Sequence, residues 1–285
     1  MEVHTTAGRT TFAFAHSASY RSIELKLFDA VRSMNPDNFS ILLRMQPYHV
    51  NSLLQLSDVF KINGDMQTAH DFVERAIFCL ETHSHHLFNP STGSTLDYKV
   101  YENRAYFLAL FRHVLFLSQR GCWRTALECC KFLLSLHPDD DPTCALLLVD
   151  YLSLRSGEYA FLERLHSEWR VSRHLDWLPN ISLSVALLHY FRHRENPTTV
   201  KRQHADDLLV EALIHFPEFP NILCDKIEAR MKPEVATHPF FSVAPTLANG
   251  SLRSVRMLVS LYVERTHTLW KPADVLEWLQ VCVEY

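Results

Sequence analysis

Residues 121–142, GCWRTALECCKFLLSLHPDDDP, decide the fold of this chain. A glycine opens the stretch, a small residue follows five positions later, apolar residues continue at helical spacing, and the closing part contains prolines. The small residue is Ala126, and the next two apolar positions of the pattern are Cys130 and Leu133. Because glycine tolerates the backbone angles of a tight turn and alanine lets two helices approach closely, this order is typical of a helical hairpin repeat.

The same pattern recurs elsewhere in the sequence. The matching positions after Gly64 are Ala69, Val73 and Ala76. A degenerate copy follows Gly157, with the bulky residues His166 and Trp169 where small residues are preferred. A further copy, Ala205–Pro217, keeps the spacing but lacks the glycine. Since one hairpin cannot bury its apolar face alone, hairpins of this kind stack on one another.

We therefore predict an all-α fold, a tetratricopeptide-like α-solenoid of helical hairpins. Residues 1–18 are expected to be a flexible lead, and residues 19–285 a single helical-repeat domain. Helix pairs are expected at about 49–82, 102–137, 142–171, 181–216 and 252–283, after two shorter helices at 20–34 and 37–45. Connections without helical periodicity are expected at 86–98 and 231–249. No alternation typical of strands persists long enough to predict a sheet.

The composition excludes several functional classes. Of the 285 residues, 47% are apolar and 21% are charged, which is the balance of a folded globular protein. The formal net charge of −4 gives no electrostatic footprint for nucleic acid. Only six glycines occur, and no two lie close enough to form a GxGxxG or GxxxxGK phosphate-binding loop.

Apolar runs and cysteines indicate the cellular compartment. No apolar run approaches the ~18 residues that a membrane span needs, and the N-terminus does not resemble a signal peptide. The seven cysteines form no CxxC pair and lie mostly within apolar helical patterns, which favours reduced and buried thiols. We therefore expect a soluble intracellular protein that does not contact membranes.

Seventeen histidines raise the question of a metal site. The densest group is Cys79, His83, His85 and His86. No second ligand pair lies at a spacing recognised for zinc, and no histidine is followed by glutamate, so HExxH is absent. His189 and His193 are one helical turn apart but have no such partner either. We expect no metal and no cofactor.

The remaining reactive groups carry no catalytic pattern. GxSxG and the kinase loop set are absent, and the thiols of Cys122, Cys129 and Cys130 have no evident activating base. The acidic run 139–141 is expected to solvate a turn and to cap the helix that follows. The basic residues that flank the fourth turn are expected to be solvated rather than bound to phosphates. We expect no enzymatic activity.

Several segments are more specific than a generic repeat. They are Pro47-Tyr48-His49 followed by LLQLSD at 53–58, ENRAYFLALFRH at 102–113, the stretch 121–142, and Leu178-Pro179-Asn180. Together they resemble the transcription factor 25 family, also known as subunit 1 of the ribosome quality control complex. The resemblance covers nearly the whole chain and is least distinct towards its C-terminal end.

The resemblance implies a non-enzymatic scaffold that acts on stalled large ribosomal subunits with an E3 ubiquitin ligase, a nascent-chain-binding factor and an AAA+ ATPase. It also implies help in forming ubiquitin chains of the proper linkage and in bringing in the ATPase that extracts the stalled chain for degradation. The implied location is cytoplasmic and ribosome-associated, with a nuclear location left open. We expect this chain to correspond to the central part of a longer protein, without the family's basic N-terminal region, and therefore to make no direct DNA contact.

Two other functions stay open at this point. The family's older name reflects a proposed nuclear role, so a transcriptional cofactor is one alternative. A generic tetratricopeptide-type module, which binds a short peptide in its concave groove, is the other.

Six residues are the candidates for partner binding: Tyr48, His49, Asp97, Tyr98, Asn103 and Arg104. They cluster in sequence at the entry to the first repeat and around the loop inserted at 86–98, before the second repeat. Repeat packing does not require them, loops on a rigid scaffold commonly carry recognition, and Arg and Tyr are enriched at interface hot spots. The alternative is that Arg104 ties the inserted loop down through Asp97 or a backbone carbonyl.

Overall fold

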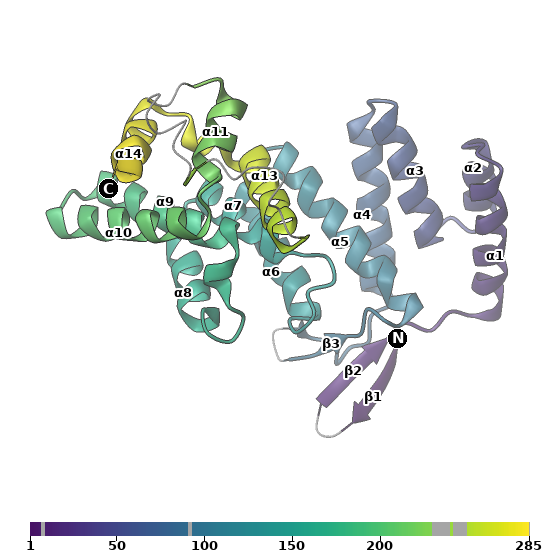
Figure 1. Ribbon diagram of the computed structural model, residues 1–285. Helices are drawn as coiled ribbons and strands as arrows, with labels where there is room; N and C mark the ends of the chain where they lie inside the picture. Colours follow the sequence, from purple (N-terminus) through teal and green to yellow (C-terminus); the bar gives the residue numbers. More distant parts are fainter. Residues whose placement is uncertain (7–8, 91–92, 230–239, 242–249, 285) are drawn as a thin grey trace. The chain divides into compact units, whose positions relative to one another are not determined.

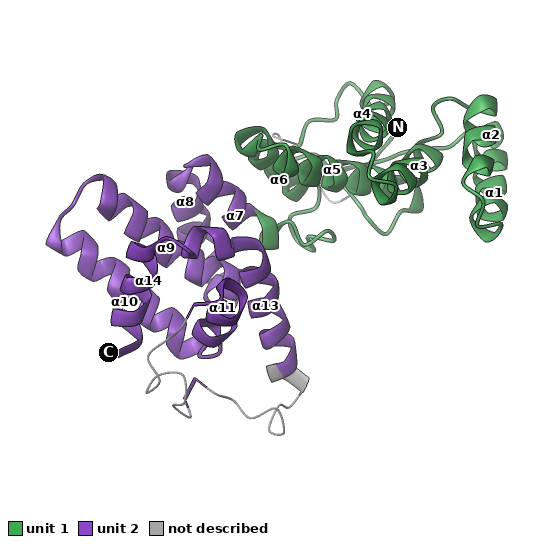
Figure 2. Cartoon of the chain, turned by 90° about the horizontal axis from the view of Figure 1, so that it is seen from above, with its two compact units in different colours: residues 1–148 green, residues 149–285 purple. Residues whose placement is uncertain are grey.

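The computed structural model describes residues 1–6, 9–90, 93–229, 240–241 and 250–284. The chain divides into two compact units, unit 1 (Met1–Leu148) and unit 2 (Val149–Tyr285), where the sequence led us to expect one domain (Figure 2). Each unit buries large apolar side chains of its own, such as Phe107 in unit 1 and Trp270 in unit 2. Two separate cores are the physical reason for the division.

Unit 1 is built from helices and one small sheet (Figure 1). Its elements are β1 (Glu2–Thr6), β2 (Arg9–Ala13), α1 (Ala18–Arg32), α2 (Asp37–Met45), α3 (Val50–Ile62), α4 (Met66–Thr82), β3 (Thr95–Leu96), α5 (Tyr101–Gln119) and α6 (Trp123–Leu136). The next helix, α7 (Leu146–Ser156), begins at the end of unit 1 and continues into unit 2.

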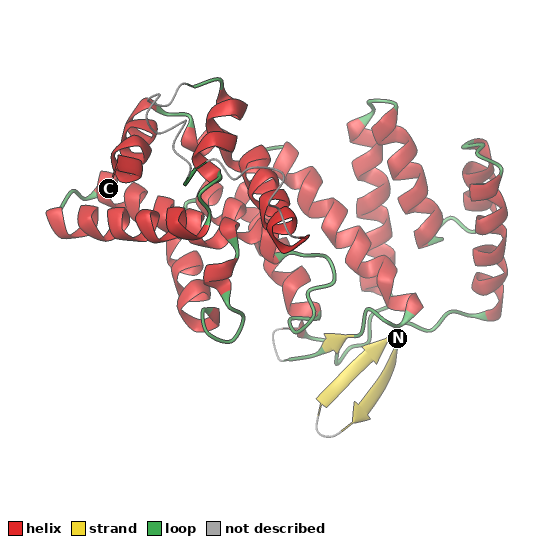
Figure 3. Cartoon of the chain, in the orientation of Figure 1, coloured by secondary structure: helices red, strands yellow, loops and turns green. Residues whose placement is uncertain are grey.

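Unit 2 is helical throughout its described part (Figure 3). Its further elements are α8 (Tyr159–Trp169), the 3-10 turn η2 (Leu175–Trp177), α9 (Pro179–Glu195), α10 (Thr199–His215), α11 (Phe219–Ile227), α13 (Gly250–Trp270) and α14 (Ala273–Glu284). The prediction of an all-α fold of helical hairpins is confirmed. Helix α11 was not predicted, and the connection expected at 231–249 lies outside the described residues except for 240–241.

The glycines of the repeat close the turns as predicted. Gly64 and Gly121 adopt φ of +84° and +78°, angles that residues with a Cβ rarely adopt. The amide of Asp65 donates to the carbonyl of Phe60 at 3.0 Å, and that of Cys122 to the carbonyl of Leu117 at 2.9 Å. These bonds over five residues are those of a Schellman motif with glycine just past the helix end.

The small residues of the pattern lie where the helices cross. Ala69, Ala126 and Ala205 are all fully buried, in the closely packed hairpins α3–α4, α5–α6 and α9–α10. The last predicted pair is arranged differently, because α13 packs chiefly on α11 and α14 packs on α10. Aromatic contacts account for this, since Trp270 meets Phe219 edge-on at 5.0 Å between ring centroids.

The expectation of a flexible lead at residues 1–18 is wrong. Strands β1 and β2 form an antiparallel hairpin, and β2 pairs in parallel with β3 through Thr11↔Thr95 and Phe12↔Leu96. Phe12 and Leu96 are buried, and the Phe12 ring meets Phe88 edge-on at 5.2 Å. Burial of these side chains against the inserted loop orders a segment whose own alternation is too short to predict a sheet.

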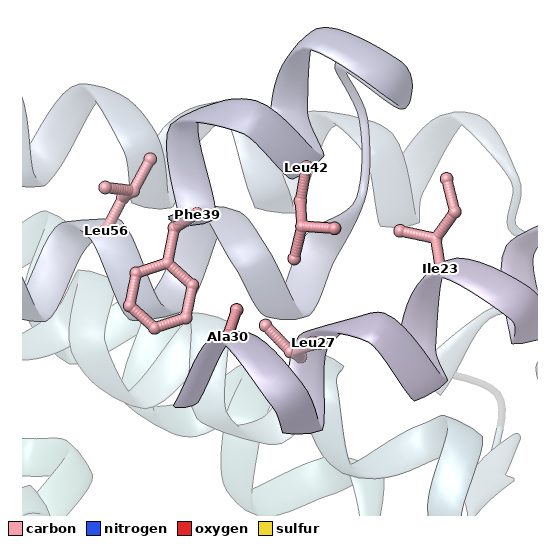
Figure 4. Close-up of a cluster of buried hydrophobic side chains, with 6 residues drawn as sticks. All are labelled: Ile23, Leu27, Ala30, Phe39, Leu42 and Leu56. Carbon is pink, nitrogen blue, oxygen red and sulfur yellow. The ribbon is translucent and has the colours of Figure 1, made fainter. Parts of the chain in front are cut away.

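The helical hairpin α1–α2 is held to α3 by a cluster of apolar side chains (Figure 4). Its members are Ile23, Leu27 and Ala30 of α1, Phe39 and Leu42 of α2, and Leu56 of α3. One face of α1 and one face of α2 are therefore used for packing against α3, and the opposite faces are not.

Candidate functional site

The six candidate residues all lie in unit 1. Tyr48 and His49 stand between α2 and α3, Asp97 and Tyr98 follow β3, and Asn103 and Arg104 are in the first turn of α5. The structure gives them different surroundings, so each has to be judged by its own contacts.

Asn103 is fully buried and holds the N-terminal sheet to α5. Its Oδ1 accepts the amide of Phe14 at 2.9 Å, and its Nδ2 donates to the carbonyls of Phe12 and Asp97 at 3.3 and 2.9 Å. All the polar atoms of this side chain are therefore satisfied inside the protein. The prediction that Asn103 contacts a partner is corrected: it is a structural clamp.

Arg104 clamps the inserted loop. Its Nε donates to the carbonyl of Tyr98 at 3.1 Å, its NH2 donates to the carbonyl of Lys99 at 3.3 Å, and its guanidinium lies 5.6 Å from the Tyr98 ring centroid. Asp97 stabilises the same turn, since its Oδ1 accepts the amide of Lys99 at 2.8 Å. This is the structural alternative raised for Arg104, with backbone carbonyls as its partners.

His49 is fully buried and caps α3. Its Nδ1 accepts the amide of Ser52 at 3.3 Å, so we assign the ring proton to Nε2, which lies 2.8 Å from Oε2 of Glu24. A partner could not reach this ring without opening the core. His49 is therefore also corrected from a partner residue to a structural one.

Glu24, which the sequence did not single out, is the centre of this buried network. Burial by itself would raise the pKa of Glu24, but hydrogen bonds from His49, Tyr101 and Asn51 outweigh it and hold the pKa below its usual value. Asn51 donates from Nδ2 at 2.8 Å, and the Tyr101 hydroxyl donates to the same oxygen, Oε1. The signal available in the sequence was a carboxylate placed directly beside Ile23 on the apolar stripe of α1.

Tyr48 remains exposed, as a partner-binding residue should be. Its ring is 52% exposed, and the guanidinium of Arg75 lies 5.5 Å from its centroid. Arg75 in turn donates from NH2 to the carbonyl of Pro47 at 2.8 Å. The ring is thus held in place by α4 while one face stays open.

A cavity of about 410 Å³ lies beside Tyr48. It is formed by the end of β2, the start of α1, the segment before α3 and the C-terminal end of α4. Its lining includes Phe14, His16, Tyr20, Tyr48, Leu80 and His83. Carboxylate side chains are absent among the described residues that line it. The cavity is aromatic in character and large enough to receive a side chain of another molecule.

Aromatic rings connect this cavity to the buried network. The ring centroids of His16 and Tyr20 are 4.3 Å apart, and those of Tyr20 and His49 are 4.6 Å apart. Burial is the main cause that lowers the pKa of His16, with Glu102 acting in the opposite direction. The His16 ring is therefore neutral near pH 7 and offers the cavity an uncharged imidazole.

The densest histidine group of the sequence does not form a metal-binding arrangement. The His83 ring bonds through Nδ1 to the carbonyl of Cys79 at 2.7 Å, so that nitrogen carries the proton. His85 and His86 stack on each other with centroids 4.3 Å apart. These contacts are those of a helix end and the loop after it.

A different group brings metal-ligand atoms together: His70, Glu74 and His113, on α4 and α5. The Nε2 of His70 lies 3.3 Å from Nδ1 of His113 and 3.5 Å from Oε1 of Glu74. However, Arg120 donates to Nδ1 of His70 at 3.1 Å, which places the ring proton on Nε2. A hydrogen bond from His70 to His113 therefore fits these atoms better than a cation does.

Unit 2 contains a buried carboxylate, Asp150. Asp150 accepts hydrogen bonds from Nδ2 of Asn180 at 2.9 Å and from the hydroxyl of Ser184 at 2.8 Å. Burial raises the pKa of Asp150 to about 6, with these two hydrogen bonds opposing the shift. Asn180 belongs to the motif Leu178-Pro179-Asn180, and its hydrogen bond to Asp150 gives this motif a structural role.

Cys129, Cys130 and Cys224 have the properties of structural cysteines, whereas Cys122 and Cys144 are exposed. Burial raises the pKa of Cys129, and it raises the pKa of Cys224 to about 11. Cys130 is fully buried at the crossing of α5 and α6. A raised pKa lowers the fraction of thiolate, which is the form that a nucleophile needs.

The acidic run 139–141 caps a helix, as predicted. The Asp141 carboxylate accepts the amides of Ala145 and Leu146 at 2.8 and 2.9 Å.

Comparisons with known proteins agree with one another. The family described as "Transcriptional repressor TCF25" matches residues 12–285. The human "Ribosome quality control complex subunit TCF25" is 41% identical over 279 residues, which cover 96% of this chain and 41% of the relative. The Dictyostelium discoideum protein of the same name is 33% identical over 96% of this chain and 40% of its own length.

A fungal relative matches over a smaller part. "Ribosome quality control complex subunit 1" of Schizosaccharomyces pombe is 31% identical over 189 residues, 66% of this chain and 29% of its own length. The chain thus spans about two fifths of the length of the most similar of these relatives. Within the part of the chain that the structure describes, helices fall short of the length and apolar character needed to cross a membrane.

Proposed function

The chain belongs to the transcription factor 25 family, and from this membership we propose that it is a non-enzymatic scaffold of ribosome-associated quality control. One observation carries the proposal: 96% of the chain matches, at 41% identity, a protein named as a subunit of the ribosome quality control complex. The scaffold assists the ubiquitylation and extraction of stalled nascent chains on the large ribosomal subunit.

The partners follow from this role. They are an E3 ubiquitin ligase, a nascent-chain-binding factor, an AAA+ ATPase and the large ribosomal subunit, in the cytoplasm and with a nuclear pool left open. The chain helps ubiquitin chains form with the proper linkage and helps bring in the ATPase. The fold supports a scaffold, since helical hairpins present extended surfaces to other proteins.

Two observations support a non-enzymatic role in this proposal: the names of the relatives and the surroundings of the buried carboxylates. The relatives are named as complex subunits or transcription factors rather than as enzymes. The carboxylates that are buried in the described part of the chain, Glu24 and Asp150, both accept hydrogen bonds within the protein. Neither of them faces the cavity beside Tyr48.

The contact site for a partner is centred on Tyr48 and the cavity beside it. Tyr48 is exposed and held by Arg75, which limits the entropy lost when a partner packs on the ring. Asp97, Tyr98 and Arg104 form a loop surface in the same unit. His49 and Asn103 act on this surface only by fixing the segments that carry it.

The test is affinity purification from cells in which translation is stalled. The wild-type protein should recover the ligase, the ATPase and large subunits that bear ubiquitylated nascent chains. Tyr48→Ala should reduce this recovery roughly tenfold at an unchanged melting temperature, because the ring is half exposed. Arg104→Ala should lower the melting temperature, because its bonds to Tyr98 and Lys99 are lost.

Ile62→Ala is the matched control, since Ile62 is an exposed apolar residue at the other end of α3. It should change neither recovery nor melting. Wild-type protein that recovers none of these components would overturn the proposed function. Normal recovery by Tyr48→Ala would overturn the contact site and leave the function standing.

A nuclear transcriptional cofactor is the second candidate, favoured by the description "Transcriptional repressor TCF25" of the matching family. The net charge of −4 gives no electrostatic support for DNA binding by this chain, so contact would run through DNA-binding proteins. Chromatin fractionation decides between the two: a cofactor should be recovered with chromatin, and a quality control scaffold with large ribosomal subunits.

A generic peptide-binding module is the third candidate, favoured by the cavity beside Tyr48. Such a module should bind the C-terminal tail peptide of a chaperone-like partner, and Leu80→Trp should block binding by filling the cavity. Tail-peptide binding without any recovery of quality control components would select this candidate over the scaffold.

A further inference from the structure

The first hairpin of unit 1, α1–α2, exposes an unusual number of large apolar side chains. Six of them lie within residues 25–45: Leu25 is 67% exposed, Phe28 49%, Val31 42%, Met34 88%, Ile41 52% and Met45 52%. Single exposed apolar residues are common, but a group of this size on two adjacent helices marks an interaction surface.

Of these, Leu25 and Phe28 on α1 and Ile41 and Met45 on α2 occupy the faces that point away from the core, and Met34 lies between the two helices. On α1, Leu25 and Phe28 are three residues apart, while Ile23, Leu27 and Ala30 point into the cluster (Figure 4). On α2, Ile41 and Met45 are one helical turn apart, while Phe39 and Leu42 point inward. We call the surface formed by Leu25, Phe28, Ile41 and Met45 the outer face.

The position of the hairpin makes this exposure significant. α1 and α2 form the first hairpin of unit 1 and pack on α3 (Figure 1). Among the described residues, α1 and α2 pack on each other and on α3, so their opposite faces need polar side chains unless something else covers them. An apolar outer face at this place instead fits a surface that another molecule covers.

Charge narrows down the occupant. Arg21 and Arg32 flank Leu25 and Phe28 on the same stripe of α1, at spacings of four, three and four residues. Lys26 and Arg44 are exposed on the same two helices, and the exposed acidic residues there are Asp29 and Asp37. The salt bridges of the described residues include none of these four cations.

We propose that the outer face of α1–α2 binds an acidic amphipathic helix of a partner protein. Apolar side chains on one stripe of that helix pack on Leu25, Phe28, Ile41 and Met45, and carboxylates beside the stripe pair with Arg21 and Arg32. The surface is distinct from Tyr48 and its cavity, so the proposal does not depend on the proposed function.

Three other occupants are disfavoured by the same observations. A second copy of this face would bring its cations against one another, since basic residues outnumber acidic ones on it. Nucleic acid would pair with the arginines through its phosphates but would not cover the apolar side chains at the centre of the outer face. A membrane surface would accept both the apolar and the basic residues, but Asp29 and Asp37 would face its anionic headgroups.

The test places a photo-cross-linking benzoylphenylalanine at position 28 of the full-length protein in cells, and at position 78 as the control. Phe78 is an exposed aromatic residue on α4, outside the outer face. Position 28 should cross-link to a segment with apolar residues three or four apart and a net negative charge. Arg21→Glu combined with Arg32→Glu should reduce this cross-link roughly tenfold with an unchanged circular dichroism spectrum.

A synthetic peptide of the cross-linked segment then gives the affinity. Phe28→Ala should weaken its binding roughly tenfold, and added salt should weaken binding further by screening the arginines. The proposal is overturned if position 28 links to a second copy, to unit 2 of the same chain, to nucleic acid or to lipid. It is equally overturned by binding to phosphatidylserine-containing vesicles in place of the peptide, or by cross-linking at position 28 no stronger than at position 78.

Discussion

The hairpins α5–α6 of unit 1 and α9–α10 of unit 2 close by different means, although unit 2 also has a glycine turn, at Gly157 between α7 and α8 with φ of +75°. In unit 1, α5–α6 turns on Gly121 at φ of +78°, whereas in unit 2 α9–α10 has no glycine. There the hydroxyl of Thr198 caps α10 by accepting the amide of Lys201 at 3.3 Å. Yet Ala126 and Ala205, at the two helix crossings, are both fully buried. In these two hairpins the crossing alanine is therefore the same while the turn differs, whereas α7–α8 keeps the glycine and has the buried Leu162 at the alanine position.

The two units also treat a buried carboxylate in opposite ways. Glu24 in unit 1 receives three hydrogen bonds, one of them from a histidine, and its pKa is lowered although burial opposes this. Asp150 in unit 2 receives bonds from two neutral side chains, and burial raises its pKa to about 6. The number of donors, rather than burial alone, decides which form of the carboxyl group is stable.

The largest effect expected from this contrast is the loss of the Glu24 carboxylate. Glu24→Ala leaves the donors of His49, Asn51 and Tyr101 without their acceptor and should lower the free energy of unfolding by about 3–5 kcal/mol in total, at ~1–3 kcal/mol for each buried donor. Urea denaturation measures this. Glu128→Ala removes a surface ion pair with Lys131 in the same unit and should change stability by less than about 1 kcal/mol. Equal effects of the two variants would contradict the central role of Glu24.

The pH dependence of the two carboxylates should have opposite signs. Because the folded pKa of Asp150 is raised from 3.8 to about 6, its contribution to stability is complete below pH 4 and is lost as the pH rises through 6. The loss is about 3 kcal/mol for a shift of roughly two units. Glu24, with a lowered pKa, instead stabilises above pH 4.5 and loses this contribution as the pH falls.

Asp150→Asn should remove the loss of stability that ionisation of Asp150 causes as the pH rises. Relative to the wild type, the variant should gain stability between pH 4 and pH 7, as measured by urea unfolding at each pH. Asp207→Asn, at an exposed position of α10, is the control and should follow the wild-type curve. If the difference in unfolding free energy between the wild type and Asp150→Asn does not change with pH, Asp150 is ionised throughout this range.

Enlarging the crossing alanines should cost a similar amount in both units. Ala126→Leu and Ala205→Leu each add a bulky side chain to a fully buried crossing and should lower the free energy of unfolding by about 1–3 kcal/mol. The midpoint and slope of chemical denaturation measure this. A large effect at one alanine only would break the equivalence of the two hairpins.

The smallest expected effect separates the turns. Gly64→Ala places a Cβ at φ of +84°, where nothing lies within 4 Å, so only backbone strain of about 1–2 kcal/mol opposes it. Asn196→Ala in the turn of α9–α10, where no positive φ is required, should change stability by about 0.5 kcal/mol or less. If thermal melting shows equal shifts for the two variants, the glycine turn gives unit 1 no special constraint.

The candidate site shows how far sequence reasoning reaches. Tyr48 was selected as a residue that repeat packing does not require, and it is exposed beside a cavity. His49 and Asn103 were selected by the same argument and are fully buried. The pattern identified polar residues without a role in the repeat, but it could not tell a recognition role from a capping or clamping role.

The N-terminal sheet shows a second limit. Phe12 and Phe14 alternate in the sequence, but the alternation is too short to distinguish a strand from a flexible segment. What orders it is β3, a partner more than eighty positions away, together with the buried amide of Asn103. A prediction from local periodicity has no access to that pairing.

The sequence by itself determined the helices and the Gly64 and Gly121 turns, because these depend on contacts within about one helical turn. It also indicated the small residues at the crossings, through their repeated spacing within the hairpin pattern. It also determined the family, through segments spread over the chain. Only the tertiary structure decided which polar side chains are buried, how Glu24 and Asp150 differ in pKa, and that the outer face of α1–α2 stays uncovered in unit 1. These properties arise from side chains brought together from distant positions, and their desolvation and pairing energies exist only once the units have packed.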